Sequence, residues 1–326
     1  MIKEFFMYFD FSILFFLFSE QYHIFTYMKL SAIIITALLY TSNSFAQQLH
    51  FTSQYLLHNS MYNPGAAGIT DNSSTVGLSY RNQWASFPGN PKTFMVYGDF
   101  NLQKLKAGIG TYLYRDVTGP TSRTGVQFAY SYHVKLNNDK AKLGLGLEMR
   151  VLQFAIDKTK LTDALGNDPV LAGSSNKIAP DAGAGVYYTN GRLSVGIAAS
   201  QLIQSKLELA SVTGTNLRAK LYRHYNIMGS YQIPTGDNIT LIPNFMYRFI
   251  QNAPSEFDMG CKLDYQQKVW FNLNYRDKQF WSAQAGLYIL KKVGLGYSYD
   301  YYLNPATLDN SGFAAHEFSL RFDLKK

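Results

Sequence analysis

Hydrophobic and polar residues alternate along most of the chain beyond residue 72. Between 141 and 155, leucine, methionine and valine occupy the odd positions from 143 to 151, whereas lysine, glycine, glutamate and arginine occupy the even positions. The same pattern recurs in 122–136, 292–302 and 314–324. A period of two residues places neighbouring side chains on opposite faces, so each run is predicted to be a β-strand with one apolar and one polar face.

The alternation predicts fourteen strands joined by connections of two lengths. The strands are expected at about 73–82, 92–101, 105–115, 122–136, 141–155, 181–189, 191–200, 222–232, 238–249, 256–265, 268–276, 279–290, 292–302 and 314–324. Tight turns are expected at 102–104, 137–140, 190–191, 235–237, 266–267 and 291, and longer links at 83–91, 116–121, 156–180, 201–221, 250–255 and 303–313. Only the link at 277–278 breaks this alternation. Short turns at one rim and long links at the other are typical of outer-membrane barrels.

A secreted β-sandwich would also have one apolar and one polar face on each strand. Here the apolar faces stay rich in tyrosine, phenylalanine and leucine along strands of about 10 residues, the length that crosses a bilayer when tilted. Tyrosine and tryptophan also gather near the strand ends, where an interfacial girdle would lie. We therefore predict an all-β fold, a transmembrane antiparallel up-and-down outer-membrane β-barrel of about 14 strands.

The composition agrees with a sheet protein at a membrane. Aromatic residues make up 16% of the 326 residues and charged residues another 16%, against about 25% charged residues in ordinary soluble domains. The net charge of +8 is not concentrated in any block of lysine and arginine, so nucleic acid is not expected as a partner. The single cysteine, Cys261, excludes an intramolecular disulfide and lies too far along the chain to carry a lipoprotein anchor.

The N-terminal part of the chain has the pattern of a secretory signal. The run from Met28 to Ala46 has a basic start, an apolar centre and small residues at the two positions that signal peptidase reads. Because this pattern is complete without the upstream residues, we expect translation to start at Met28 rather than Met1. The expected organisation is 1–46 as an upstream extension plus signal peptide with cleavage after Ala46, 47–72 as an N-terminal periplasmic or plug segment, and 73–326 as the barrel.

No arrangement of residues points to an enzyme. The Gly-x-Gly pairs open no helix and lack the third glycine of a dinucleotide site. They are expected to face the lumen and to make room for bulky neighbours or for bending of the sheet. The histidines have no metal-ligand spacing, and Ser131 with His133 lacks a carboxylate partner. We expect no catalytic residue, no metal and no cofactor. The glycine pairs are Gly108/Gly110, Gly144/Gly146, Gly183/Gly185 and Gly294/Gly296.

Charged residues of both signs fall on the polar faces of the predicted strands. They are expected to form cross-strand ion pairs that fill a wide lumen, with a polar channel or a binding surface for an inserted segment as the alternative. On this basis Leu145→Arg should destabilise the barrel, whereas Gly146→Ser on the lumenal face should be mild. These charged residues are Arg81, Lys135, Lys142, Glu148, Arg150, Asp258, Lys262, Asp264, Arg276, Asp300, Glu317, Arg321 and Asp323.

Short motifs spread over residues 50 to 323 resemble the PorP/SprF family of type IX secretion system membrane proteins. They include Tyr62-Asn63-Pro64-Gly65-Ala66-Ala67-Gly68 and Tyr80-Arg81-Asn82-Gln83-Trp84, then Gly119-Pro120-Thr121, Arg223-His224-Tyr225, Asp300 and His316-Glu317. Their order and spacing together carry the resemblance. The motif positions that it marks as structural or partner-binding are Asn63, Pro64, Gly68, Arg81, Trp84, Gly119, Pro120, Thr121, Arg223, His224, Tyr225, Asp300, His316 and Glu317.

The resemblance implies an outer-membrane barrel of Bacteroidota that works with the type IX secretion and gliding machinery, in a family not known as enzymes. The implied partners are outer-membrane lipid, type IX secretion components and large secreted cargo proteins. The function expected is to help export or surface attachment of secreted proteins, and the alternative is a general diffusion porin or solute channel. Partner recognition is expected in the links 156–180, 201–221 and 303–313. The sequence indicates neither the cargo nor the oligomeric state.

Overall fold

The computed structural model describes residues 52–69, 74–138, 140–161, 174–212, 215–251, 253–290, 292–303 and 314–324, with the backbone alone for 174–175 and 206–220. The chain divides into two compact units, 1–46 and 47–326. The predicted signal peptide and its cleavage site lie outside the described residues.

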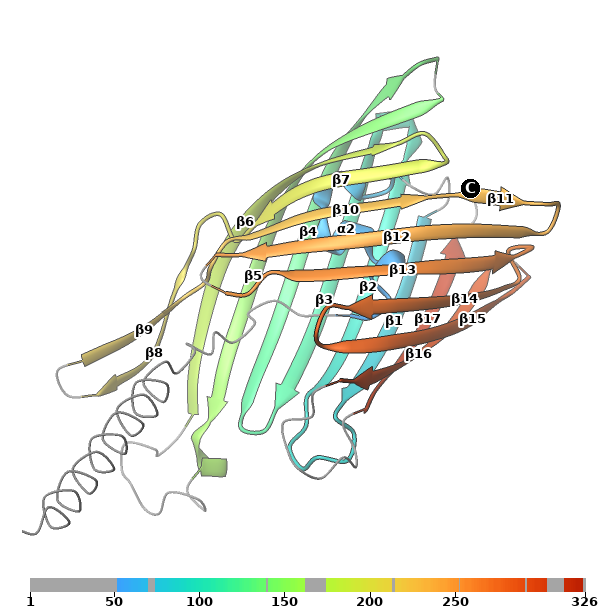
Figure 1. Cartoon of the computed structure of the whole chain (residues 1–326). Helices are drawn as coiled ribbons and strands as arrows, with labels where there is room; N and C mark the ends of the chain where they lie inside the picture. Colours follow the sequence, from blue (N-terminus) through green and yellow to red (C-terminus); the bar gives the residue numbers. More distant parts are fainter. Residues whose placement is uncertain are drawn as a thin grey trace, which may run out of the picture. The chain divides into compact units, whose positions relative to one another are not determined.

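The second unit is a closed antiparallel barrel of fourteen strands (Figure 1). Its strands are β1 (Ser74–Gln83), β2 (Lys92–Leu102), β3 (Ala107–Thr118), β4 (Thr121–Leu136), β5 (Ala141–Asp157), β6 (Ser174–Thr189), β7 (Leu193–Ser200), β10 (His224–Tyr231), β12 (Ile239–Ile250), β13 (Glu256–Tyr265), β14 (Val269–Arg276), β15 (Phe280–Ile289), β16 (Val293–Tyr302) and β17 (Ala314–Leu324). Sequential neighbours pair around the wall, β1 pairs with β17, and β10 bridges β7 and β12. A short strand, β11 (Ile233–Thr235), continues β10 along β12. The predicted fold class is confirmed.

The connections differ from the expected ones in places. The strands β5 and β6 run on beyond the expected ends and pair as far as Asp157 and Ser174, because continued pairing satisfies their backbone groups. The expected link 116–121 is only a turn at Gly119 and Pro120. The expected link 201–221 contains a separate hairpin of β8 (Lys206–Val212) and β9 (Thr215–Lys220). The centre of the link 156–180 and most of the link 303–313 lie outside the described residues.

The wall has an apolar outer face and a polar inner face, as the alternation predicted. Leu147 and Met149 are 68% and 66% exposed, whereas Glu148 between them is 3% exposed. Exposed leucine, phenylalanine and tyrosine on the outside suit a bilayer, while the buried charges lie in the lumen. We call the end with the turns at 103–106, 190–192 and 266–268 the short-turn rim, and the opposite end the long-link rim.

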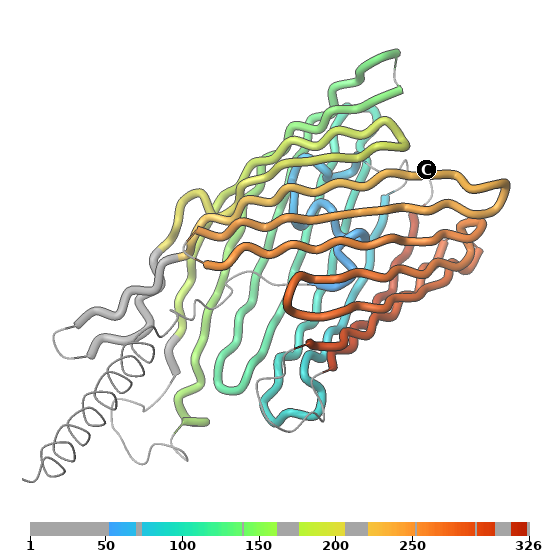
Figure 2. The backbone as a smooth tube through the Cα atoms, in the orientation of Figure 1, coloured from blue at the N-terminus to red at the C-terminus, as the bar shows by residue number. Residues whose placement is uncertain are grey.

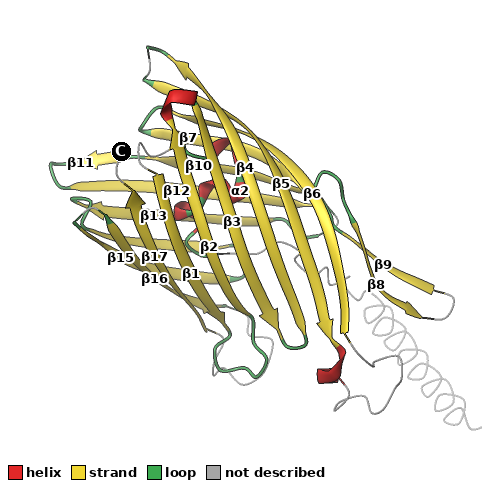
Figure 3. Cartoon of the chain, turned by 180° about the vertical axis from the view of Figure 1, so that it is seen from behind, coloured by secondary structure: helices red, strands yellow, loops and turns green. Residues whose placement is uncertain are grey.

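Residues 52–69, which we call the lumenal segment, lie inside the barrel. Figure 2 shows their tube, in blue, enclosed between the strands in front and behind, and Figure 3 shows their short helices inside the wall. The segment consists of turns η1 (Tyr55–Leu57), α2 (Asn59–Tyr62) and η2 (Pro64–Ala66). All of its residues are buried except Leu56, Leu57 and Asn59, which are partly exposed. No helix among the described residues is long and apolar enough to cross a membrane.

Candidate functional site

The turn at residues 63–66 is built by its own sequence and anchored to the wall. The Asn63 side chain caps η2 by accepting a hydrogen bond of 2.9 Å from the Gly65 amide. Pro64 fits the first helical position, where a missing N–H leaves nothing unsatisfied. The Asn63 amide also donates to the Val186 carbonyl of β6 at 3.0 Å. One side chain therefore shapes the turn and attaches it to the barrel.

Glycines on the inner face of the wall form the seat of this turn. A Cβ atom at Gly144 would lie 2.0 Å from the Gly65 carbonyl oxygen, and one at Gly146 would lie 2.2 Å from the Gly65 nitrogen. A Cβ at Gly185 would lie 2.2 Å from the Asn63 Oδ1. Real side chains never approach so closely, and the atoms met are backbone or a capping group. The expectation that Gly146→Ser would be mild is therefore wrong, because the space beside Gly146 is occupied by the lumenal segment.

The end of the lumenal segment has a second glycine seat. Gly68 adopts φ of +62°, and its amide donates to Asp99 of β2 at 2.6 Å. A Cβ at Gly108 would lie 1.9 Å from the Ala67 carbonyl oxygen. Gly108, Gly144 and Gly146 thus make room for the backbone of the segment, whereas Gly183 and Gly294 lie against the side chains of Glu148 and Tyr288, the bulky neighbours that the sequence predicted.

A first ion-pair cluster holds the start of the segment. Arg81 of β1 pairs with Asp300 of β16 at 2.7 Å and with Glu317 of β17 at 3.2 Å. The Ser53 hydroxyl donates to Asp300 at 2.6 Å, and its amide donates to Glu317 at 2.9 Å. The Thr52 hydroxyl also donates to Glu317. One arginine thus faces two buried carboxylates, and the segment adds donors to both, including the Thr52 hydroxyl on the Glu317 Oε1, while the arginine pairs with Oε2.

A second cluster holds the middle of the segment. Glu148 pairs with Arg150 on the same strand at 2.8 Å, and accepts hydrogen bonds from Gln127 at 2.7 Å and Ser200 at 2.9 Å. The Arg150 guanidinium in turn donates to the Met61 carbonyl at 2.8 Å. This carbonyl ends a helical turn and needs a donor when buried. The wall supplies a charged one, which makes the stronger kind of hydrogen bond.

A third cluster lies across the lumen from the second. Asp258 of β13 accepts from Arg276 at 2.7 Å and from Arg248 at 3.0 Å, and Arg248 also pairs with Glu256 at 2.9 Å. The Arg248 guanidinium lies 5.8 Å above the ring of Tyr62. The cluster thus combines balanced charge with a cation–π contact to the segment.

His58 is the one histidine of the lumenal segment, and it lies in an aromatic setting. Its ring is fully buried and meets the ring of Tyr97 edge to face at 4.5 Å, with Tyr112 at 6.2 Å. Neither ring nitrogen has a hydrogen-bond partner among the described residues. Burial, with Arg321 as a smaller cause, lowers the pKa of His58 to about 3. His58 is therefore a neutral packing group at ordinary pH.

Contacts of the lumenal segment extend around most of the barrel. Its hydrogen bonds reach Arg81 of β1, Asp99 of β2, Tyr112 of β3, Ser131 of β4, Arg150 of β5, Val186 of β6, Asn226 of β10, Asn244 of β12, Gln284 of β15, Asp300 of β16 and Glu317 of β17. The segment therefore joins strands on opposite sides of the wall and occupies the lumen between them.

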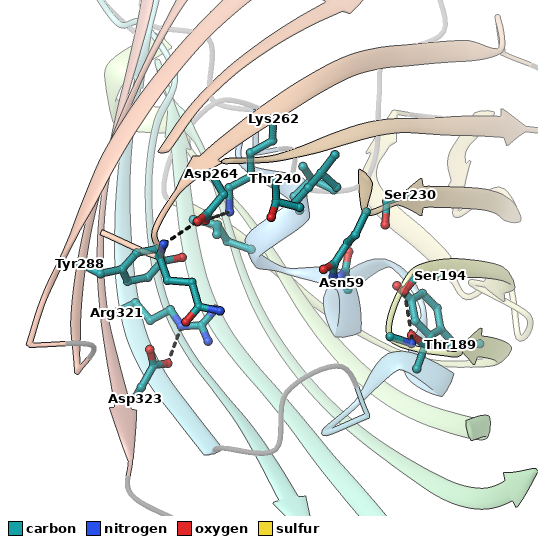
Figure 4. Close-up of a pocket in the computed structure, with 17 residues that line it drawn as sticks. Asn59, Thr189, Ser194, Ser230, Thr240, Lys262, Asp264, Tyr288, Arg321 and Asp323 are labelled. Atoms are coloured by element: carbon teal, nitrogen blue, oxygen red, sulfur yellow. Dashed lines mark hydrogen bonds and ion pairs between the residues drawn. The ribbon is translucent and has the colours of Figure 1, made fainter. Parts of the chain in front are cut away.

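A cavity of about 410 Å³ remains between the lumenal segment and the short-turn rim. Figure 4 shows lining side chains from several strands around it, including Lys262, Asp264, Arg321 and Asp323. Among the described residues no group of histidine, cysteine, aspartate and glutamate has the arrangement of a metal site. The lumen thus contains a protein segment and a polar cavity.

Comparison with known families agrees with this arrangement. Residues 44–322 match the family of the type IX secretion system membrane protein PorP/SprF. The chain belongs to the PorP/SprF family. No curated protein sequence matches it. Membership in the family and the barrel fold together place this protein in the bacterial outer membrane.

Solved structures of outer-membrane barrels share the fold of this PorP/SprF chain. CymD, a monoaromatic hydrocarbon channel, is similar with a TM-score of 0.50 and 10% identity, covering 86% of this chain and 95% of that one. A FadL homologue of Pseudomonas aeruginosa has a TM-score of 0.47 and 12% identity, and the match covers 81% of this chain and 93% of the homologue. Omp33 of Acinetobacter baumannii has a TM-score of 0.46 and 9% identity, and the match covers 77% of this chain and 98% of Omp33. At 10% identity, the likeness to CymD concerns the barrel fold alone.

The PorP/SprF motif residues fall into separate places. Those in the lumen are Asn63, Pro64, Gly68, Arg81, Asp300 and Glu317, all at contacts between the lumenal segment and the wall. At the long-link rim, the Trp84 ring lies 6.1 Å from that of Tyr302. In the β3–β4 turn, the Gly119 amide donates to Gly89, the Pro120 carbonyl accepts from Asp157, and the Thr121 hydroxyl donates to Thr118. The structure does not bring these rim residues into the lumenal cluster.

The remaining PorP/SprF motif residues lie on both faces of the wall. His224 faces the lumen and bonds to the Tyr222 carbonyl at 2.9 Å, while the neighbouring Arg223 carbonyl accepts from Gln251 at 3.1 Å. Tyr225 is 37% exposed on the outer face. His316 also faces outward and bonds to the Tyr297 hydroxyl at 2.8 Å. The adjacent Glu317 points into the lumen, as strand alternation requires.

Sequence reasoning missed several residues that hold the segment. Ser53 and Asp99 were not singled out, and Gln127 was assigned only to a polar strand face. Their signal is weak because a serine, aspartate or glutamine on a polar face does not identify its partner. A usable signal was the recurrence of lumenal glycines on β3, β5 and β6, which marks a place where another backbone approaches.

Proposed function

We propose that this PorP/SprF protein is a closed outer-membrane barrel that helps export or surface attachment of secreted proteins as a docking component, not as a solute channel. The observation that carries the proposal is the lumenal segment, whose residues 52–69 lie across the lumen and bond to strands around the wall. In this proposal the segment acts as a plug.

The energetics favour a plug that stays in place. Withdrawal would break buried hydrogen bonds, each contributing about 1 kcal/mol, or more where a charge takes part. It would also leave Asp300 and Glu317 with fewer donors. A diffusion porin needs a water-filled path, and this arrangement works against one.

The charged clusters also support a scaffold role. Arg81, Arg150 and Arg248 each contact both a wall carboxylate and the segment. A rigid, filled barrel holds its rims in a constant geometry, and loops on a rigid scaffold are the usual place for recognition. We propose the long-link rim as the surface that meets secreted proteins.

The test combines conductance with secretion. Purified protein in planar bilayers should show no steady ion conductance, and deletion of residues 52–69 should produce steady openings in barrels that retain heat-modifiable gel mobility. Cells that lack the protein should fail to display or release one or a few large secreted proteins while small-solute uptake is unchanged. Steady conductance of the intact protein, together with altered solute uptake and normal secretion, would establish the porin alternative.

A further inference from the structure

The cavity below the lumenal segment opens towards the short-turn rim. Its lining includes Gly191 and Gln267 from turns of that rim and Asp323 near the end of β17. Its floor is formed by Leu56, Leu57 and Asn59, the residues of the segment that are not fully buried. A molecule bound in this cavity would therefore touch the lumenal segment directly.

The charges of the cavity are balanced within each strand. Lys262 lies 3.7 Å from Asp264 on β13, and Arg321 lies 2.6 Å from Asp323 on β17. The Lys262 ammonium also lies 5.2 Å from the ring of Trp270. An anionic ligand would have to compete with the carboxylates that already lie beside Lys262 and Arg321. A cationic ligand would have to compete with that lysine and arginine for the same carboxylates. This favours an occupant without net charge at this depth.

The uncharged lining has an apolar floor and polar walls. The apolar lining consists of the side chains of Leu56, Leu57 and Ile242. The polar lining includes the hydroxyls of Ser194, Ser230 and Thr240, on the inner faces of neighbouring strands. The Thr189 hydroxyl also forms a hydrogen bond of 2.9 Å with that of Ser194. A hydrocarbon ligand would cover the leucines but would strip water from the hydroxyls without replacing its hydrogen bonds. The occupant must therefore offer both apolar surface and hydrogen-bonding groups.

An extended polypeptide meets both requirements. Each residue carries a backbone donor and acceptor for the hydroxyls, and an apolar side chain can cover the leucines. Removing that carbon from water contributes about 25 cal/mol per Å². A glycan could also bond to the hydroxyls and stack on the partly exposed ring of Tyr288, but its hydroxyl-rich surface would cover Leu56 and Leu57 less well than an apolar side chain would. The cavity volume lies within the roughly 300–1,000 Å³ of ligand pockets.

We propose that this cavity binds an uncharged, extended polypeptide segment of another protein, inserted through the short-turn rim against Leu56 and Leu57. The inference rests on the proposed function, since it gives a secretion component a second docking site on the face opposite the long links. Contact with the segment also places the partner where it can hold or release the plug.

The first test is photocrosslinking in intact cells. A benzoylphenylalanine probe at Leu57 should give one defined crosslinked adduct. Protease digestion should shorten this adduct, and mass spectrometry should assign the crosslink to a single region of one polypeptide. A matched probe at Leu273, 54% exposed on the outer face, should not give this adduct. No polypeptide adduct at Leu57, or an adduct made of glycan or lipid, would overturn the proposal without requiring any other variant.

The second test fills the cavity. Ser230→Trp and Thr240→Trp should each lower the Leu57 adduct at least about tenfold, equivalent to about 1.4 kcal/mol, and should impair secretion as loss of the protein does. The control is Tyr231→Trp, the next residue on the outer face of the same strand, which should change neither. Heat-modifiable mobility reports that each barrel has assembled.

The outcomes separate this inference from the proposed function. If loss of the whole protein blocks secretion but the assembled tryptophan variants secrete normally and keep the adduct, the cavity proposal is wrong and the proposed function stands. If loss of the protein leaves secretion intact, the proposed function is wrong, whatever the Leu57 probe captures.

Discussion

The side-chain amide of Asn63 donates to the backbone carbonyl of Val186 at 3.0 Å, linking the lumenal segment to a wall strand more than a hundred residues later. The same side chain caps the turn at Pro64–Ala66, so the fold of the segment and its attachment depend on one residue. This coupling makes the seat of the segment sensitive to small changes in the wall.

Gly146→Ala should displace the lumenal segment. The new Cβ would lie 2.2 Å from the Gly65 nitrogen, and overpacking of this kind costs about 1–3 kcal/mol. Planar-bilayer recordings should show openings absent from the unmodified protein. The control is Gly294→Ala on the same inner face, where the nearest atom belongs to the Tyr288 side chain at 3.1 Å and can move. Equal conductance of the two variants would contradict the glycine seat.

Arg81→Met should destabilise the barrel by about 3–5 kcal/mol, because Asp300 and Glu317 would remain buried without their arginine. Urea titration followed by heat-modifiable mobility measures the loss. Lys160→Met, which removes an exposed ion pair of 3.8 Å with Asp157, should change stability far less, because water screens this pair. Similar midpoints for the two variants would count against the role of the Arg81 cluster.

Acidification should favour release of the lumenal segment through His58. Burial lowers the pKa of His58 to about 3, against about 6.5 for a free imidazole. The released segment therefore binds an extra proton between these pH values, so the seated form loses stability as pH falls from 6.5 towards 3. Bilayer conductance across this range should rise less steeply in His58→Phe than in the unmodified protein. Identical pH profiles would show that His58 does not contribute.

Leu145→Arg should destabilise the barrel by about 2–4 kcal/mol, since it places a charge on the apolar outer face of β5. Leu145 is 46% exposed and lies between Tyr132 and Val186 on the neighbouring strands. Refolding into lipid followed by urea titration gives the size of the effect. Leu145→Met is the control and should change stability by less than about 1.5 kcal/mol. A small effect of arginine would indicate that this face does not meet lipid.

The two rims should lie on opposite sides of the membrane, with the short turns in the periplasm. Cys261 is exposed, so a Cys261→Ser background is needed for labelling. In intact cells, an impermeant maleimide should label Ser86→Cys at the long-link rim and not Asn138→Cys at the short-turn rim. Both residues are exposed in the structure. The reverse labelling pattern would refute this orientation.

Much of the barrel could be predicted from the sequence because strand alternation is a local property. The positions of Leu147 and Glu148 determined which face each occupies, and all predicted barrel strands are present in the structure. Local patterns did not locate the ends of β5 and β6, because pairing between Asp157 and Ser174 depends on register across the sheet and not on the alternation of either strand. The hairpin of β8 and β9 was missed inside a link that was expected to contain no strand.

The sequence by itself determined the faces of the wall, the presence of charged groups in the lumen and membership in the PorP/SprF family. Only the tertiary structure decided what those charges and glycines contact. Ser53 meets Asp300, 247 positions away, and Gly65 meets Gly144, because closure of the barrel brings distant strands around one short segment. A polar residue can be satisfied by a neighbouring strand, by water or by an inserted backbone, and these alternatives have the same sequence pattern.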